Sequence, residues 1–179
     1  MKALLIIDVQ NDFIRNGSLA VNKAERIIPI INKLLQKFDY SMASKDCHPQ
    51  ESVHFKKWPP HCVAGTTGAA FPFDLDQEKI NQILYKGTSN KDDGYSAFEA
   101  NNINLIEHLQ EKGITDLYIC GIALEFCVKS TVLDALEKRL NVYMLKDAIA
   151  PFSEKEEEIK QYYSELENAG AKIISSTAV

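Results

Sequence analysis

The feature that most constrains the fold of this 179-residue chain is a regular alternation of short apolar runs with segments of helical periodicity. Six apolar runs recur along the chain, at Ala3–Ile7, Tyr40–Ala43, Gln82–Tyr85, Leu117–Cys120, Val142–Leu145 and Lys172–Ile174. Runs of this length suit strands that are buried on both faces, as in a parallel sheet. Repeated strand–helix units with right-handed crossovers therefore predict an α/β fold, a doubly wound, mostly parallel six-stranded sheet with helices on both faces.

Helical patterns occupy the segments between these runs. Asn22 precedes Glu25 by three residues, a capping-box signature, and Pro29 inside the pattern that follows predicts a kink or a late start of that helix. A second helix is expected over 104–112, ending at Gly113, and two more over 126–139 and 154–169. Two long stretches, 9–21 and 46–76, fit neither pattern, and irregular segments of this length are usually functional.

Composition narrows the class of protein. The length suits one domain over residues 1–179, and a net charge of −5 offers no basic field for nucleic acid. The apolar stretch at the N-terminus is too short for a signal sequence or a membrane span, so no membrane partner and a cytoplasmic location are expected. The four cysteines form no C-x-x-C pair, which argues against a disulfide framework and a cysteine-rich zinc site.

Polar residues stand where several of the predicted strands end. Asp8 closes the first strand, Asp46 follows the second, Lys86 closes the third and Cys127 lies just past the fourth. In open parallel sheets, ligands bind beyond the carboxyl ends of the strands. The sequence therefore predicts a site at this edge of the sheet that combines two carboxylates, an amine and a thiol.

Cys127 is a candidate nucleophile, because it lies at a strand-to-helix junction in the segment GIALEFCV. Unpaired amides at a helix N-terminus favour negative charge, so we expect a lowered pKa for this thiol. Asp8 could take the thiol proton, and Lys86 could keep Asp8 ionised. Backbone N–H groups of the same turn could stabilise an oxyanion formed by attack on a carbonyl.

Three of the four histidines, His48, His54 and His61, fall in the second irregular stretch together with Asp46. Nitrogen and oxygen donors of this kind suit Zn²⁺, Fe²⁺ or Mn²⁺, although histidines scattered along a loop remain the alternative. Aromatic residues also lie in the irregular segments, and such rings could hold a flat ligand between them. They are Phe13, Trp58 and Tyr95.

Taken together, these segments resemble the nicotinamidases, which belong to the isochorismatase-like superfamily of cysteine hydrolases. The resemblance covers about residues 2 to 150 and rests on LLIIDVQNDF, the D-x-H-P segment, WPPHCVAGTTGA, GYSAF after Lys86, and GIALEFCV. The first and last of these mark the superfamily. D-x-H-P with W-P-x-H-C-V-x-G-T is more specific, because members that act on other substrates generally lack that metal site.

The resemblance implies a role for each matching residue. It implies a catalytic triad of Asp8, Lys86 and Cys127, and an oxyanion hole made by the backbone amides of Ala123 and Cys127 with a cis peptide in the region 122–124. Metal ligands would be Asp46, His48 and His61, with His54 as a fourth ligand because Ser52 and His54 are swapped relative to the D-x-H-P-x-x-H-x-S-F pattern of many members. Phe13 and Trp58 would flank a pyridine ring, with Tyr95 at the pocket wall.

The implied activity is hydrolysis of nicotinamide to nicotinate and ammonia through a cysteine thioester, with NAD salvage as its natural context. A divalent metal would orient the ring, with Zn²⁺ as the first candidate and Fe²⁺ or Mn²⁺ as alternatives. Small molecules, nicotinamide and also pyrazinamide, are the expected partners, and a homo-oligomer is left open.

Rival interpretations remain at this point. Another amidohydrolase, or an isochorismatase-type hydrolase on the same scaffold, would not need a metal for a ring nitrogen. A flavodoxin-like binding module would need a glycine-rich first turn, which VQNDFIRNG lacks. A thiol-based redox sensor would need a resolving cysteine, and none lies close to Cys127 in sequence.

Overall fold

The computed structural model describes residues 1–179 and has at its centre a six-stranded, all-parallel sheet with the order β3-β2-β1-β4-β5-β6. The strands are β1 (Lys2–Ile7), β2 (Ser41–Asp46), β3 (Gln82–Lys86), β4 (Asp116–Ile122), β5 (Asn141–Ala150) and β6 (Lys172–Ile174). The order reverses between β1 and β4, so the chain winds first toward β3 and then toward β6. The doubly wound sheet expected from the six apolar runs is confirmed.

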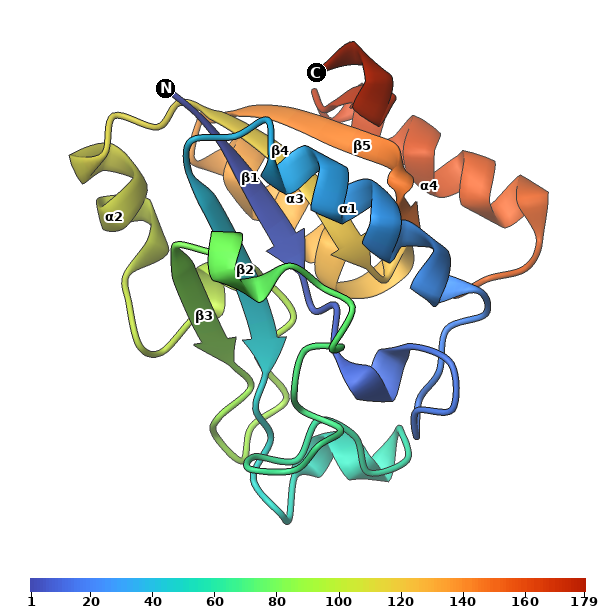
Figure 1. Cartoon of the computed structure of the whole chain (residues 1–179). Coiled ribbons are helices and arrows are strands. Elements are labelled where there is room, and N and C mark those ends of the chain that lie inside the picture. The colour runs from blue at the N-terminus through green and yellow to red at the C-terminus, as the bar shows by residue number, and fades with distance from the viewer.

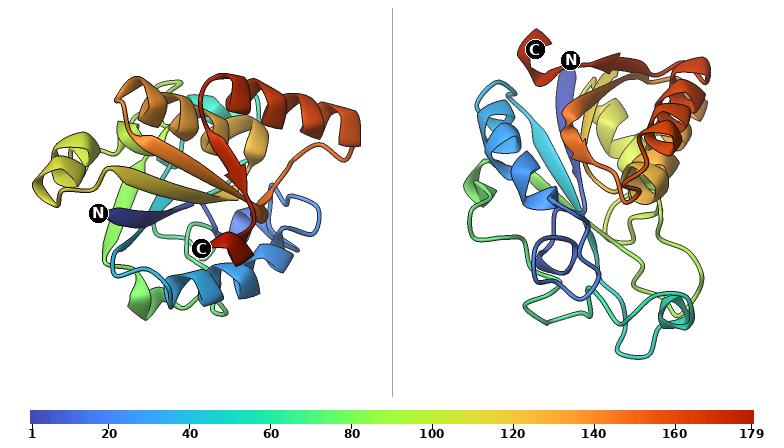
Figure 2. Two further views of the ribbon diagram at one scale, coloured as in Figure 1. Left: turned by 90° about the horizontal axis from the view of Figure 1, so that it is seen from above. Right: turned by 90° about the vertical axis from the view of Figure 1, so that its right-hand side faces the viewer.

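Helices cover both faces of the sheet. They are α1 (Ile28–Leu35), α2 (Leu105–Glu111), α3 (Lys129–Glu137) and α4 (Glu156–Asn168). Figure 2 shows α1 alone on one face, with α2, α3 and α4 on the other. None of these helices is long and apolar enough to cross a membrane.

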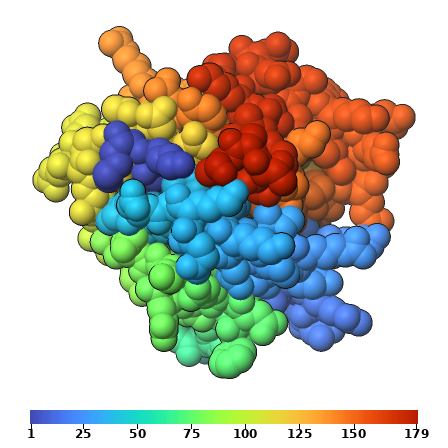
Figure 3. All heavy atoms as spheres, turned by 45° about the horizontal axis from the view of Figure 1, so that its top comes forward, coloured from blue at the N-terminus to red at the C-terminus, as the bar shows by residue number.

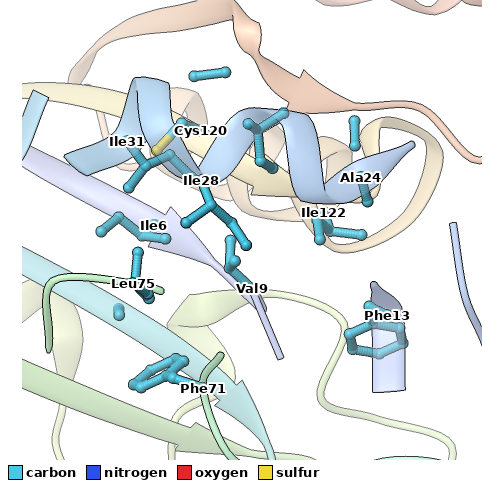
Figure 4. Close-up of a cluster of buried hydrophobic side chains, with 14 of the residues drawn as sticks. Ile6, Val9, Phe13, Ala24, Ile28, Ile31, Phe71, Leu75, Cys120 and Ile122 are labelled. Atoms are coloured by element: carbon cyan, nitrogen blue, oxygen red, sulfur yellow. The ribbon is translucent and has the colours of Figure 1, made fainter. Parts of the chain in front are cut away.

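Each face buries its own apolar cluster because both faces of the central strands are apolar. In β1, Leu4 and Ile6 pack toward α1, and Leu5 and Ile7 pack toward α3. Figure 4 shows the first cluster, in which Ile6 and Val9 meet Ile28 of α1. The C-terminal turn closes this face, because Lys37 Nζ donates to the Val179 carbonyl oxygen at 2.8 Å, and Figure 3 shows the last residues lying against the α1 segment.

Two helix starts differ from the expectation. Asn22 caps no helix, because its amide nitrogen donates to Glu154 Oε1, and the chain turns through Lys23 at φ 58° without a side-chain cap. A 3₁₀ turn follows, and α1 begins at Ile28 with Pro29 in its first turn, so the late start is confirmed. The helix expected from Phe126 begins instead as a π-helical turn over 124–128, which leads into α3.

The strands extend further than the apolar runs predicted. β2 continues through Ser44 and Lys45 to Asp46, and β5 continues through Lys146 and Asp147 to Ala150. Polar side chains interrupt both apolar runs, and the β4–β5 register shifts between Ile119 and Gly121. Because β2 reaches Asp46, this carboxylate lies at the end of its strand beside Lys86, its register partner on β3.

The long irregular segments after β1 and β2 lie together beyond the carboxyl ends of the strands, at the bottom of Figure 1. Their only regular elements are short 3₁₀ turns, including 11–13 and 53–56. Several backbone hydrogen bonds join the two segments, among them Asn11 N–H to Ala70 O at 2.9 Å and Asp12 N–H to Gly68 O at 3.0 Å. The two loops therefore form one layer over the edge of the sheet.

Gly121 provides a test of how closely β1 and β4 pack. Its φ is +120°, and a Cβ added there would lie 2.1 Å from the Ile7 carbonyl oxygen on the neighbouring strand. At Gly113, φ is +63° and a Cβ would meet nothing within 4 Å. We expect Gly113→Ala to lower the free energy of unfolding by about 1 kcal/mol, and Gly121→Ala to lower it by at least about 2 kcal/mol more, because overpacking adds to the strain.

Urea denaturation of the two variants measures this difference. Equal losses of stability would contradict the close β1–β4 contact.

Candidate active site

Lys86 is the centre of the site, and its side chain is fully buried at the end of β3. Its ammonium group lies 2.7 Å from Asp8 Oδ2 and 2.6 Å from Asp46 Oδ1, and it also donates to the Gly94 carbonyl oxygen at 2.7 Å. The Cys127 sulfur is 3.5 Å from the same nitrogen. The four polar residues expected at this edge of the sheet are therefore in contact around one amine.

Asp8 is held by its neighbour on β2 as well as by Lys86. It follows β1 directly with φ 47°, and its Oδ1 accepts a hydrogen bond from the Ser44 hydroxyl at 2.7 Å. Burial raises the pKa of Asp8 above its ordinary value, while Lys86 opposes the rise and Asp46 adds to it. Asp8 is therefore a stronger base than an exposed carboxylate.

Asp46 divides its two oxygens between two neighbours. Oδ1 pairs with Lys86, and Oδ2 lies 3.6 Å from His48 Nε2. Burial alone would raise the pKa of Asp46, but Lys86 and then His48 outweigh it and hold that pKa below its usual range. The sequence placed Lys86 beside Asp8 alone, whereas the structure shows it shared between both carboxylates.

The expectation of a lowered pKa for the Cys127 thiol is wrong. Burial raises the pKa of this thiol well above its usual value, Lys86 opposes the rise, and the carboxylates of Asp8 and Asp46 add to it. Cys127 lies within the π-helical turn over 124–128, so its sulfur does not sit at the N-terminus of a regular helix. The resting thiol keeps its proton and needs a base, and Asp8 has an oxygen within 4.8 Å of the sulfur.

A second group of polar atoms adjoins the first. Asp46, His48 and His61 each place one ligand atom within 4.8 Å of the others, and all three residues are buried. His48 Nδ1 donates to the Gly87 carbonyl oxygen at 3.0 Å, so its Nε2 carries the lone pair, and this atom is buried without a hydrogen-bond partner. His61 Nδ1 likewise bonds to the Pro59 carbonyl oxygen at 2.8 Å. An orphaned imidazole nitrogen beside a carboxylate oxygen fits a divalent cation.

His54 is not brought into this group. Its Nε2 donates to the Asp93 carbonyl oxygen at 2.9 Å, and its ring lies beside that of His48, tilted by 31° with 4.6 Å between centroids. The Ser52 hydroxyl accepts a hydrogen bond from the His54 N–H and so caps the 3₁₀ turn that carries His54. In the swapped order, Ser52 therefore fixes the backbone of this turn.

A cavity that opens to solvent joins the two polar groups, with an empty volume of about 550 Å³. The Cys127 thiol, Asp46 and His61 line it together with the three aromatic residues expected from the sequence. These are Phe13, Trp58 and Tyr95. Its other walls are mostly apolar and include Leu19, Val21, Phe126 and Phe152, none of which the sequence singled out.

Ala123 lies on the lining of the cavity next to the thiol. The Ile122–Ala123 peptide bond is cis, within the region where one was expected. The Ala123 N–H donates no hydrogen bond within the chain. A free amide donor at the cavity wall is what an oxyanion hole requires.

Two polar residues to which the sequence analysis assigned no role fix the end of β2 and the loop after it. Gln10 is fully buried, and its side chain bonds both the N–H and the C=O of Asp46 at 2.8 Å. Asp12 accepts from the Cys62 N–H at 2.7 Å and so anchors the segment that carries His61. Both lie in the segment DVQNDF, and their spacing of two and four residues from Asp8 is the only local feature of the sequence that could have pointed to them.

Comparison with known proteins gives consistent matches over nearly the whole chain. The Isochorismatase domain family matches residues 2–178. A nicotinamidase of Acinetobacter baylyi is 38% identical over 170 residues, which cover 82% of this chain and 79% of the relative.

Two solved structures are similar in fold and sequence. A pyrazinamidase of Pyrococcus horikoshii in complex with zinc is 36% identical, with 97% and 98% of the two chains covered and a TM-score of 0.88. A protein of L. infantum in complex with nicotinate is 33% identical, with 99% and 94% covered and a TM-score of 0.92.

Lys86→Met tests the central ion pairs through stability. The substitution leaves two buried carboxylates without their cation, so we expect the free energy of unfolding to fall by about 3–5 kcal/mol. The control is Lys57→Met, which removes an exposed pair with Asp92 and should cost at most about 1 kcal/mol. Denaturant unfolding in the presence of a chelator measures both, and similar losses for the two variants would contradict the central role of Lys86.

Proposed function

The chain belongs to the isochorismatase family, and we propose that within this family it is a nicotinamidase, an amidohydrolase that converts nicotinamide to nicotinate and ammonia. One observation carries the proposal. A single cavity presents the Cys127 thiol together with Asp46 and His61 of the donor group, between apolar and aromatic walls. A nucleophile for the carboxamide and a cation site for a ring nitrogen are thus available to one small ligand.

The first half of the proposed reaction forms a thioester. Asp8 takes the proton of the Cys127 thiol while the sulfur attacks the carboxamide carbon, and the N–H groups of Ala123 and Cys127 stabilise the resulting oxyanion. When the tetrahedral adduct collapses, the carbon–nitrogen bond breaks. Asp8 returns the proton to the leaving nitrogen, which departs as ammonia.

The second half releases the product. Asp8 takes a proton from water, whose oxygen attacks the thioester carbon, and the carbon–sulfur bond breaks as the sulfur recovers a proton. The net change is one water consumed, with one nicotinate and one ammonium ion formed once ammonia takes up the proton of the carboxylic acid. Lys86 remains an ammonium throughout, because burial alone would lower its pKa but Asp46 and Asp8 raise it well above the ordinary value.

We assign the orientation of the ligand to two features, the donor group of Asp46, His48 and His61 and the aromatic walls of the cavity. Asp46, His48 and His61 would hold a divalent cation, with Zn²⁺ preferred over Fe²⁺ or Mn²⁺. His54 is left out of this set because its Nε2 donates to the Asp93 carbonyl oxygen. When bound, this ion supplies a Lewis acid for the pyridine nitrogen. Phe13 and Trp58 would flank the ring, with Tyr95 at the side, so the carboxamide is directed at the thiol.

Ammonia release from nicotinamide tests the proposed function. Purified protein loaded with zinc should release ammonia, and Cys127→Ala should reduce the rate at least about a thousandfold, as expected for loss of a nucleophile. The matched control is Cys120→Ala, since Cys120 lies in the core of β4. Another amidohydrolase or isochorismatase activity would be favoured if the zinc-loaded protein left nicotinamide intact.

Metal removal and ligand variants test the cation site. Loss of a residue that only hydrogen-bonds to a metal ligand lowers metal affinity by about 10- to 100-fold, and loss of a direct ligand should lower it at least as much. We therefore expect His48→Ala to weaken zinc binding by about 100-fold or more. His54→Ala should change the affinity little, because its Nε2 is engaged by Asp93. Calorimetric titration of chelator-treated protein measures both. Unchanged zinc affinity in His48→Ala would contradict the assigned donor group.

A further inference from the structure

The cavity has an aromatic wall made from three distant parts of the chain. Trp58, Phe126 and Phe152 pack edge to face, with ring centroids 5.3 Å apart for Trp58–Phe126, 5.9 Å for Trp58–Phe152 and 5.7 Å for Phe126–Phe152. All three line the cavity that contains the Cys127 thiol. Phe126 precedes the nucleophile by one residue, whereas Phe152 follows β5, and it remains 40% exposed.

Phe152 lies in no helix or strand, and its position depends on one carboxylate. Glu125 Oε2 accepts a hydrogen bond from the Phe152 N–H at 2.8 Å, and Oε1 accepts one from the Ser153 N–H at 2.9 Å. Hydrogen bonds to an ionised acceptor are among the stronger ones in proteins. Glu125 stands two residues before Cys127, so it ties the segment after β5 to the turn that carries the nucleophile.

These contacts fix the segment itself and do not cap α4. That helix begins at Glu156, after Lys155, and Ser153 makes its own bond to Glu158 through its hydroxyl at 2.7 Å. Both N–H groups bound by Glu125 precede the helix by three residues or more. The two bonds therefore determine where the Phe152 ring lies relative to Phe126.

We propose that Phe152 is a specificity-determining residue, whose ring completes the aromatic wall and limits the bulk that a ring substrate can carry, and that Glu125 is the positioning residue that holds it there. The inference rests on the proposed function for its substrate class. Each of the three rings contacts the other two edge to face at one wall of the cavity, so a methyl group that a substrate carries toward this wall would meet a ring. Glu125 does not line the cavity, so in this proposal it acts through Phe152.

Kinetics with nicotinamide and its ring-methylated derivatives test the proposal. We expect Phe152→Ala to raise KM for nicotinamide with kcat nearly unchanged, and to improve kcat/KM for at least one methylated derivative relative to nicotinamide by about tenfold, the effect of one methyl group in an apolar pocket. Glu125→Ala should shift selectivity in the same direction. Unchanged relative rates in Phe152→Ala would overturn the assignment.

The double variant distinguishes positioning from a separate contribution. If Glu125 acts through Phe152, Glu125→Ala combined with Phe152→Ala should show the selectivity of Phe152→Ala alone, whereas additive shifts would overturn the positioning role. If Glu125→Ala folds poorly, Glu125→Gln replaces it in this test. This variant keeps the shape of the side chain and one acceptor oxygen, so we expect a shift in selectivity between those of the wild-type protein and Phe152→Ala. The controls are Phe73→Ala, at a ring that is 99% exposed, and Glu157→Ala, on the exposed side of α4.

Hydrogen exchange provides a measurement that does not depend on the substrate. The amides of Phe152 and Ser153 should exchange faster in Glu125→Ala than in the wild-type protein, and equal exchange would overturn the positioning role. Wild-type activity on nicotinamide is measured first. Its absence would remove the proposed function, while the exchange result would still decide whether Glu125 holds the segment.

Discussion

The fold and the site both depend on one buried ammonium group shared by two buried carboxylates. Lys86 bonds Asp8 and Asp46 at 2.7 Å and 2.6 Å. Lys86 and Asp46 end β3 and β2, and Asp8 directly follows the adjacent strand β1. The cluster of two carboxylates and one ammonium has a net charge of −1, which is costly in a buried setting. A cation on the side of Asp46 that faces His48 would offset it. The same arrangement thus supports both a base at Asp8 and a cation site at Asp46.

This arrangement also bears on the proposed attack by the Cys127 thiol. A thiolate beside two carboxylates is disfavoured, and one ammonium does not compensate for three negative charges, so the pKa of Cys127 is raised. In the proposed reaction, the thiol proton therefore moves during attack, to a carboxylate whose own pKa burial has raised. Asp8 meets that condition, whereas Asp46 is held ionised by Lys86 and His48.

Local sequence pattern predicted the strands and the edge of the sheet that carries the site. Apolar runs and strand ends are short-range signals, so the sequence alone is enough to group Asp8, Asp46, Lys86 and Cys127. The direction of the thiol pKa does not follow from such signals, because it depends on burial and on charges from other strands. The sequence also did not predict the position of Phe152 in the pocket. The N–H groups of Phe152 and Ser153 donate to the carboxylate of Glu125, which lies 27 and 28 residues earlier in the chain.

Helix starts show a similar limit. The Asn22 and Glu25 spacing matched a capping box, yet Asn22 pairs with Glu154 from the far end of the chain, so a tertiary contact replaced the local one. Pro29, whose effect is steric and local, was interpreted correctly. Patterns that act within one turn of the chain were therefore more reliable than those that compete with distant partners.

A thioester on Cys127 is tested most directly by peptide mass spectrometry of protein quenched in acid during turnover of nicotinamide. We expect a nicotinoyl group as a thioester on Cys127, absent before substrate is added and lost once the substrate is consumed. Cys120 lies seven residues earlier and serves as an internal reference that stays unmodified. Steady turnover with Cys127 free of the nicotinoyl group, or with that group on Cys47 or Cys62, would contradict the account.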